Sequence, residues 1–409
     1  MLDLPALPDV SGEERLKLLD DYERLAASGW PADWETLVAA RYGIRLSSRY
    51  GPHRIRNPFG KASGQLSLTV RQVKHDAAAG LGFVVLKTVI AEEAGGQRSM
   101  GDWTSRETRM KLERIRGGSG EEGWTVTWLG RGWGGSLSDY LQFYAEAVEI
   151  ARPAGMLIVP SCKYHLPGAA GEEWREEEYR YTTGRLLDAA QAARAALPMP
   201  LEKDFSPTLA GSDRASERDR ILGWLTRVPA LIRAAGGDRV ALGIKVFNAL
   251  FDDDFQLVMV SLLEEAPVRP AYLVYANRLF DPDRVFQGWR GVAYGGPDLS
   301  DRNLRVLSAR RRHPPAAPLP VSATGNIDTG RRAAQYLLCG ASSFQMHTLF
   351  QWPDTEFAMR VGGKTARALH WLVFHPEHGF IAWLLDLRRR FDLPADADVF
   401  DIAATLLRK

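Results

Sequence analysis

Residues 318–350 are the stretch that most restricts how this chain can fold. An apolar run ends at Gly325, which is the pattern of a buried strand entering a tight turn. Residues 331–340 then carry apolar side chains at helical spacing, and residues 343–349 form a second apolar strand. Backbone N–H groups at such a turn, beside a helix start, can hold a phosphate. The stretch therefore predicts a strand–helix–strand unit with an anion site at Gly325; the alternative is that Gly325 serves only the turn.

The same alternation of strand and helix recurs earlier in the chain. Helical patterns separate short apolar runs, each of which is typical of a buried strand. These runs are residues 81–88, 156–165, 240–248 and 271–277. Repeated units of this kind predict an α/β protein, and specifically a (β/α)8 TIM barrel.

Polar residues stand where these strands end, and in a barrel the carboxyl ends of the strands face the active site. The candidates are Lys87, Thr88, Ser161, Cys162, Tyr164, Lys245 and Asn277. Three of them have a plain structural alternative: Lys87 as an ordinary strand-end lysine, Cys162 as a buried and inert cysteine, and Asn277 as a turn residue.

Composition excludes several classes of protein. The chain has 409 residues, of which 45% are hydrophobic, so a large core can form. The net charge of +2 implies no strong field for nucleic acid or for a membrane surface. With only Cys162 and Cys339, the chain cannot be a disulfide-rich scaffold or hold an iron–sulfur cluster through four thiolates. We see no signal peptide and no membrane span, and expect a cytoplasmic protein.

Three segments are expected along the chain. Residues 1–45 form an N-terminal helical extension, residues 46–355 form the barrel, and residues 356–409 form C-terminal helices that close it. Within the barrel, residues 91–136 are polar and glycine-rich and predict a lid over the mouth, with a hairpin at 124–129.

Two further features concern the lid and a second long segment. The lid carries Trp103, Trp124, Trp128 and Trp133, which either stack on something flat or bury one another. Residues 166–238 are expected to form a long insertion, with helices on either side of a proline-containing loop at 198–211.

Two motifs resemble the dihydroorotate dehydrogenase and dihydropyrimidine dehydrogenase family of FMN-dependent TIM barrels. Residues 57–88 read Asn-Pro-Phe-Gly, Ala-Ser, a helix and Lys-Thr. Residues 325–345 read Gly-Asn-Ile, a helix, Gly-Ala-Ser and Gln, where the family usually has Gly-Gly-Ile. The loop Tyr294-Gly295-Gly296 also resembles the family, and the whole likeness covers residues 55–350, as in a divergent member.

The resemblance implies FMN as the cofactor. The matching FMN-binding positions are Ala62, Ser63, Lys87, Thr88, Gly295, Gly296, Gly325, Asn326, His347 and Thr348. Lys203 and Lys245 compete for the family's flavin-contacting lysine at the next strand end. Lys245 precedes Asn277 by 32 residues, enough for one helical crossover, whereas Lys203 precedes it by 74. We therefore assign Lys245.

The family's Asn-x-Ser-Cys-Pro motif is matched in part, because Ser161 and Cys162 are present. The resemblance implies that Cys162 exchanges a proton with a substrate carbon, and that Ser161, Tyr164 and Asn277 contact the substrate. Val159 and Lys163 replace the motif's asparagine and proline. A pocket that loses hydrogen-bonding partners discriminates against its polar ligand, which argues against orotate or uracil as substrate.

The resulting hypothesis is an FMN-dependent oxidoreductase that acts on a C–C single or double bond next to a carbonyl. Hydride would move through flavin N5, and electrons would come from or go to NAD(P)H, a soluble acceptor or a partner protein. Two alternatives stay open: a flavin-free, phosphate-binding barrel enzyme such as a lyase or isomerase, and a non-catalytic binding subunit. We expect a small-molecule substrate, no metal and no nucleic acid; a homodimer stays open.

Overall fold

The computed structural model describes residues 4–104, 109–129, 132–169, 171–205 and 214–408. Its centre is a parallel sheet of ten strands in the order β5-β9-β10-β11-β12-β15-β16-β3-β4-β8. Their bounds are β3 Phe59–Lys61, β4 Phe83–Val85, β5 Val89–Ile90, β8 Leu157–Val159, β9 Ser161–Lys163, β10 Met199–Asp204, β11 Val240–Lys245, β12 Tyr272–Tyr275, β15 Val321–Thr324 and β16 Ala341–Met346.

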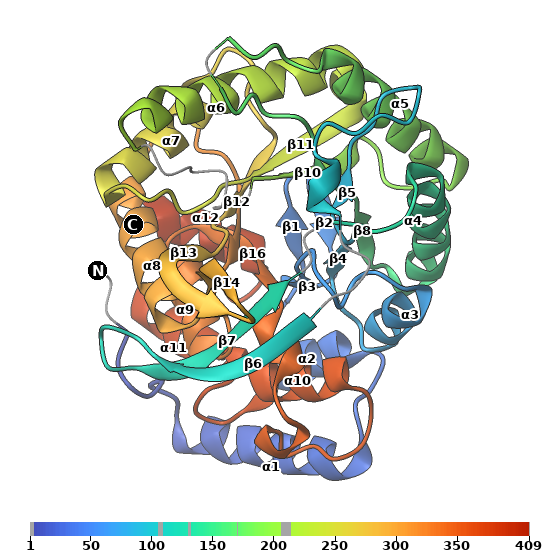
Figure 1. The fold of residues 1–409 in the computed structure, drawn as a ribbon. Coiled ribbons are helices and arrows are strands. Elements are labelled where there is room, and N and C mark those ends of the chain that lie inside the picture. Colours follow the sequence, from blue (N-terminus) through green and yellow to red (C-terminus); the bar gives the residue numbers. More distant parts are fainter. Residues whose placement is uncertain (1–3, 105–108, 130–131, 170, 206–213, 409) are drawn as a thin grey trace.

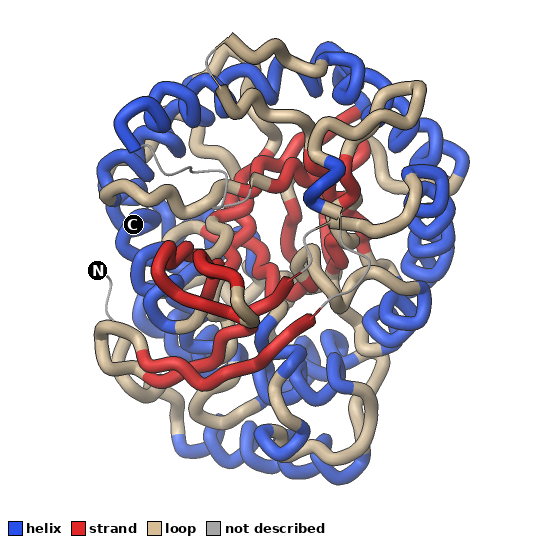
Figure 2. The backbone as a smooth tube through the Cα atoms, viewed as in Figure 1, coloured by secondary structure: helices blue, strands red, loops and turns tan. Residues whose placement is uncertain are grey.

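The sheet curls, and helices surround it (Figures 1 and 2). The two end strands of this order are β5 and β8. Strand β8 and the second strand of the order, β9, are consecutive in the chain and separated only by Pro160. The carbonyl of Pro160 accepts a hydrogen bond of 3.0 Å from the N–H of Glu202 on β10. This α/β arrangement is consistent with a TIM-like barrel.

The helices of the outer layer are α3 Val70–Ala78, α4 Leu137–Ala151, α5 Glu176–Ala192, α6 Arg214–Gly236, α7 Asp253–Glu265, α8 Pro297–Arg312, α9 Gly330–Leu338 and α12 Val399–Arg408. Short 3-10 helices are η1 Gly101–Trp103, η2 Arg152–Ala154, η4 Gly237–Arg239, η5 Thr348–Gln351 and η6 Asp354–Glu356. The strand–helix–strand unit predicted at 318–350 is confirmed as β15, α9 and β16. In the described part of the chain, no helix is long and apolar enough to cross a membrane.

A small antiparallel hairpin, β1 (Ser48–Tyr50) and β2 (His53–Ile55), closes the amino-terminal end of the curled sheet. The Tyr50 ring lies 4.4 Å from Phe83 and 4.8 Å from Tyr272, and these two residues begin β4 and β12. The Tyr50 side chain thereby fills the inside of the curled sheet at its amino-terminal end. The carboxyl-terminal end of the sheet remains for a ligand.

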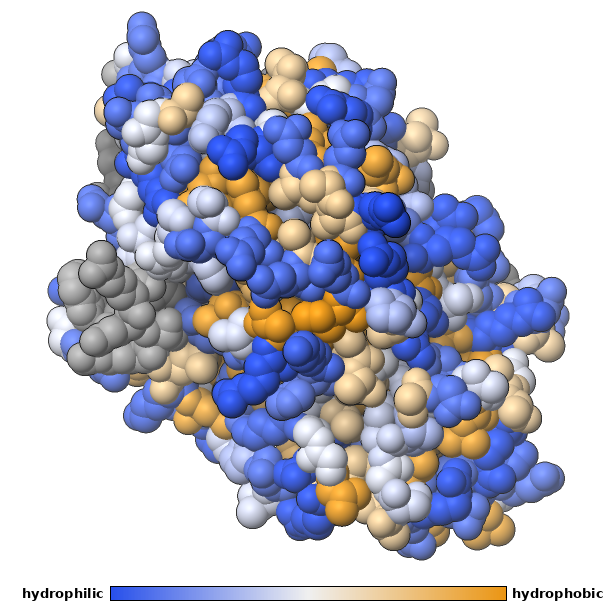
Figure 3. Space-filling model, turned by 90° about the vertical axis from the view of Figure 1, so that its right-hand side faces the viewer, coloured by the Kyte–Doolittle hydropathy of each residue, from blue (hydrophilic) through white to orange (hydrophobic). Residues whose placement is uncertain are grey.

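The two ends of the chain pack together. Helices α1 (Gly12–Ser28) and α2 (Trp34–Tyr42) lie in the N-terminal segment, and α10 (Lys364–Phe374) and α11 (Phe380–Phe391) are C-terminal. Tyr22 stacks on His370 at 4.3 Å, which joins α1 to α10. On the face of the molecule in Figure 3, apolar residues gather among hydrophilic ones, the usual mixture on folded proteins.

Two hairpins lie over the carboxyl ends of the strands (Figure 1). The first, β6 (Arg109–Arg116) with β7 (Glu122–Leu129), contains the hairpin strand predicted in the lid. The second, β13 (Leu279–Phe286) with β14 (Trp289–Tyr294), was not predicted. It follows β12 directly, so the chain leaves the sheet to form part of the lid before it reaches α8.

The loop predicted at 198–211 is wrong for residues 199–204. They form β10, which pairs with both β9 and β11, and residues 206–213 lie outside the described part. The described part of residues 166–238 thus contributes a helix, a strand of the central sheet and a helix. Glu202, Lys203 and Asp204 made this strand look like a loop, because charged residues are rarely buried unless they are paired.

Candidate functional site

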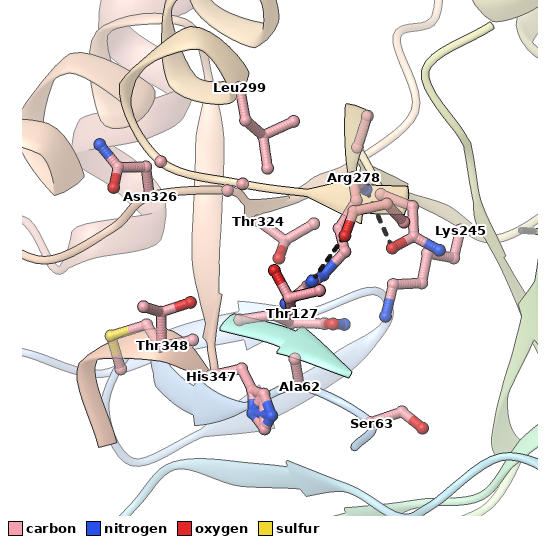
Figure 4. A pocket seen from close by; sticks show the side chains of 18 of the residues that line it. Ala62, Ser63, Thr127, Lys245, Arg278, Leu299, Thr324, Asn326, His347 and Thr348 are labelled. Carbon is pink, nitrogen blue, oxygen red and sulfur yellow. Dashed lines mark hydrogen bonds between the residues drawn. The ribbon is translucent and has the colours of Figure 1, made fainter. Parts of the chain in front are cut away.

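A cavity of about 220 Å³ opens at the carboxyl ends of the strands, below the two hairpins. Figure 4 shows side chains from several elements around it. The predicted residues that line it are Ala62, Ser63, Lys87, Thr88, Lys245, Asn277, Gly295, Gly296, Gly325, Asn326, His347 and Thr348. The tertiary structure therefore brings all the predicted FMN positions to one place, although they span most of the chain.

One side of the cavity is built from backbone. Gly296 is the N-cap of α8, and no side chain caps that helix start. Leu299, one turn into α8, also lines the cavity (Figure 4). Because the first N–H groups of a helix lack partners within the helix, this end carries a partial positive charge that favours an anion.

The Gly325 turn faces the same side. Gly325 has φ +113°, and a Cβ added there would come within 2.9 Å of Leu299 and of Asn303. The next residue, Asn326, has φ +52°, a left-handed conformation that asparagine tolerates better than most residues. This explains how asparagine can stand where the resembling family has glycine. No side chain fits at Gly325, so backbone lies close to whatever the cavity holds.

The other side of the cavity carries basic side chains from strand ends. Lys87, Lys163 and Lys245 line it, together with Asp204. Burial, and to a lesser extent Lys163, lowers the pKa of Lys87 to about 8. The Lys163 ammonium lies 2.6 Å from the Asp204 carboxylate. Although burial opposes its ionisation, Lys163 and Lys245 bring the pKa of Asp204 down to about 2.

Arg278 adds a further cation, and the sequence argument did not single it out. It follows Asn277 at the end of β12 and donates hydrogen bonds to the carbonyls of Val126 and Ala293. These carbonyls belong to β7 and β14, so one guanidinium ties both hairpins to the strand end. Figure 4 shows Arg278 at the cavity. Only its position beside Asn277 could have drawn attention to it.

His347 is half-buried and lies near several basic groups. Burial is the main cause that lowers the pKa of His347 to about 3, and Arg278 and Lys61 add to it. The imidazole is therefore neutral at physiological pH. A Cβ at Gly64 would lie only 3.2 Å from the ring, so His347 packs tightly against the loop after β3.

Three predicted residues do not line the cavity: Ser161, Cys162 and Tyr164. Side chains alternate along a strand, so Lys163 faces the cavity while Cys162 faces the helical layer with Lys203, its register partner on β10. The hydroxyl of Tyr164 lies 2.8 Å from that of Thr183 on α5. Burial raises the pKa of the Cys162 thiol to about 12. This placement does not favour Cys162 as the group that exchanges a proton.

The order of the strands in the sheet also argues against Cys162 as the group that exchanges a proton. The resemblance assigned Cys162 to the strand before the one that carries Lys245, but β10 lies between β9 and β11. Ser161 keeps an indirect link to the cavity, because its hydroxyl lies 3.0 Å from that of Thr88.

The structure also distinguishes Lys203 from Lys245, the two candidates for the flavin-contacting lysine. Lys245 lines the cavity, whereas Lys203 is fully buried outside it and donates to the carbonyl of Asp204. Burial and Lys163 lower the pKa of Lys203 to about 7. Lys245 is therefore the lysine of the two that can meet a ligand in the cavity.

Two of the four lid tryptophans, Trp124 and Trp133, pack against other aromatic rings of the protein. Trp124 lies 6.4 Å from Trp352, a cavity residue, and carries the guanidinium of Arg114 at 4.0 Å over its ring. Trp133 stacks on Phe143 of α4 at 5.5 Å. The side chains of Trp103 and Trp128 lie outside the described part.

Comparison with known proteins gives one distant relative. The chain is 25% identical over 170 residues to a dihydroorotate dehydrogenase (quinone) of Pseudomonas putida. The matched region is 40% of this chain and 48% of that enzyme, so the chain spans about half the length of the curated relative. No family model matches the chain.

Proposed function

We propose that this chain is an FMN-dependent oxidoreductase that acts on a C–C single or double bond next to a carbonyl. The observation that carries the proposal is one cavity that joins the uncapped start of α8, the Gly325 turn and several strand-end cations. Its similarity to a dihydroorotate dehydrogenase supports the same class of chemistry.

We further infer that the curled sheet is a (β/α)8 barrel. If β4 with β5, and β8 with β9, are interrupted single strands, the ten strands occupy eight positions. The bond from Glu202 to Pro160 supports this, because it joins β10 to the break between β8 and β9. A barrel places the ligand at the carboxyl ends of the strands, where the cavity lies.

The residues fit FMN in a consistent orientation. Gly296 and Gly325 would hold the phosphate, because both line the cavity and neither has a side chain of its own between its backbone and a ligand. Ala62, Ser63, Lys87 and Thr88 would line the isoalloxazine, and Lys245 would stabilise the negative charge of the reduced ring. When bound, FMN supplies hydride transfer at N5.

Proton transfer then needs a cavity-facing group whose pKa lies near the working pH. Lys87 meets both conditions, because it lines the cavity and its pKa is about 8. We assign it this role in place of Cys162. Asn277 donates hydrogen bonds of 3.1 Å to the Asp204 carboxylate and to the Phe205 carbonyl, and its position fits substrate contact.

Two other functions make different predictions. A flavin-free lyase or isomerase would use the same anion site for a phosphorylated metabolite, and the purified protein would be colourless. A non-catalytic subunit would retain flavin but would not reoxidise or reduce it with any partner. The substrate and the electron partner, whether NAD(P)H, a soluble acceptor or another protein, belong to the proposal only as classes.

The test is spectroscopic. The purified protein should show a flavin spectrum that dithionite bleaches, and denaturation should release FMN instead of riboflavin. Reduced enzyme should then be reoxidised by compounds with a C–C double bond conjugated to a carbonyl. Apoprotein that shows no saturable FMN binding in a titration would refute the proposal.

A further inference from the structure

A buried polar network lies directly beneath the cavity, inside the curled sheet. Its centre is Glu202 on β10, which is fully buried. One carboxylate oxygen lies 3.3 Å from the ammonium of Lys245 on β11. The other accepts hydrogen bonds from Gln345 on β16 at 2.7 Å and from the Tyr50 hydroxyl at 3.3 Å.

The network joins parts of the chain that are distant in sequence. Gln345 also donates to the Tyr50 hydroxyl at 2.8 Å, so the hairpin that closes the lower end takes part. Lys245 and Gln345 line the cavity, whereas Glu202 does not. Glu202 therefore contacts two residues that can meet a ligand without meeting the ligand itself.

Burying the Glu202 carboxylate costs folding free energy, so either its partners compensate its charge fully or the carboxylate has a function. Burying an ion is unfavourable, and a buried ion pair is often no more stable than apolar side chains of the same volume. Here the carboxylate holds the Lys245 ammonium within the cavity wall and offsets its charge. Charge beside a redox group changes the relative stability of its oxidised and reduced forms.

We propose that Glu202 is a positioning residue that sets the charge at Lys245 and thereby tunes the redox potential of the bound cofactor. The inference rests on the proposed FMN function. Removing the negative charge leaves the Lys245 cation less compensated, which favours the anionic reduced ring. The variant Glu202→Gln should therefore raise the midpoint potential of the bound flavin.

The control is another buried ion pair that is remote from the cavity. Glu264 on α7 lies 2.5 Å from Arg310 on α8, and both side chains are buried. Glu264→Gln removes an equivalent buried charge, so it should lower stability but leave the midpoint potential unchanged. This separates loss of a structural ion pair from an effect on the cofactor.

The experiment measures the midpoint potential of holoenzyme by dye-coupled titration in wild type, Glu202→Gln and Glu264→Gln. If Glu202→Gln does not fold, Tyr50→Phe serves instead. It keeps the carboxylate but removes one hydrogen-bond donor to it, and should lower the potential. A potential that moves no more than in Glu264→Gln, or Tyr50→Phe without a shift, overturns the inference alone. Wild-type protein that binds no FMN overturns the proposed function and this inference together.

Discussion

Gly325→Ala tests the phosphate site directly, and its cost can be worked from the geometry. Gly325 has φ +113°, and an L-residue forced into such a conformation costs about 1–3 kcal/mol. The new Cβ would also lie 2.9 Å from Leu299 Cγ and Asn303 Nδ2. Both neighbours are side chains that can shift in part, so overpacking adds about 1 kcal/mol.

The apoprotein can relieve part of this cost by moving the turn, but binding the phosphate requires the original turn. If about 1.4–3 kcal/mol must be restored on binding, FMN affinity falls by roughly 10- to 100-fold. Riboflavin lacks the phosphate, so its affinity should change little. This difference between the two ligands assigns the effect to the phosphate end.

The assay is quenching of flavin fluorescence when apoprotein is titrated with FMN and, separately, with riboflavin. Gly184→Ala on α5 is the matched control, because a Cβ there meets no atom within 4 Å. Circular dichroism confirms that each variant is folded. Unchanged FMN affinity in Gly325→Ala, or equal weakening of FMN and riboflavin, would show that Gly325 does not hold the phosphate.

Three other predictions follow from the cavity and its lid. Because the pKa of Lys87 is about 8, its protonated form is lost as pH rises, and turnover that uses this proton should fall above about pH 8. The variant Lys87→Met should abolish this fall in the pH–rate profile. An unchanged profile would contradict the role of Lys87. Cys162 faces away from the cavity, so the variant Cys162→Ala should keep its flavin and turn over within about threefold of the wild-type rate. Its free energy of unfolding should fall by about 1 kcal/mol. Complete loss of turnover with flavin retained would restore the thiol as a catalytic group. The guanidinium of Arg332 on α9 lies 2.7 Å from the carboxylate of Glu121, between β6 and β7. The variant Arg332→Met should weaken the attachment of this hairpin by about 1 kcal/mol and speed proteolysis within residues 109–129. An unchanged cleavage rate would show that other contacts hold the hairpin.

The predictable part of the fold was local. The run before Gly325 and the helical spacing of 331–340 gave a strand–helix–strand unit, because each depends on neighbours within one element. Strand β10 escaped notice because its charged side chains find partners only in three dimensions, such as Lys163 for Asp204. The β13–β14 hairpin was missed as well, so the contribution of Arg278 to the lid was not foreseen.

The candidate site was likewise predictable from the sequence only in part. Glycine positions were predictable, because a turn that needs positive φ, such as that of Gly325, restricts the residue itself. The choice between Cys162 and Lys163 was not, because neighbouring residues on a strand face opposite sides. Pro160 interrupts the strand just before them, so the alternation cannot be followed from the apolar run into the polar end.

By itself, then, the sequence determined where the turns lie and which strand ends carry polar groups, since both follow from the conformational preferences of short segments. Only the tertiary structure decided which of those groups meet. It gathered Lys245, Gly296 and Gly325 around one cavity and turned Cys162 outward. The reason is that closure of the sheet, and the register of each strand within it, depend on contacts between residues far apart in the chain.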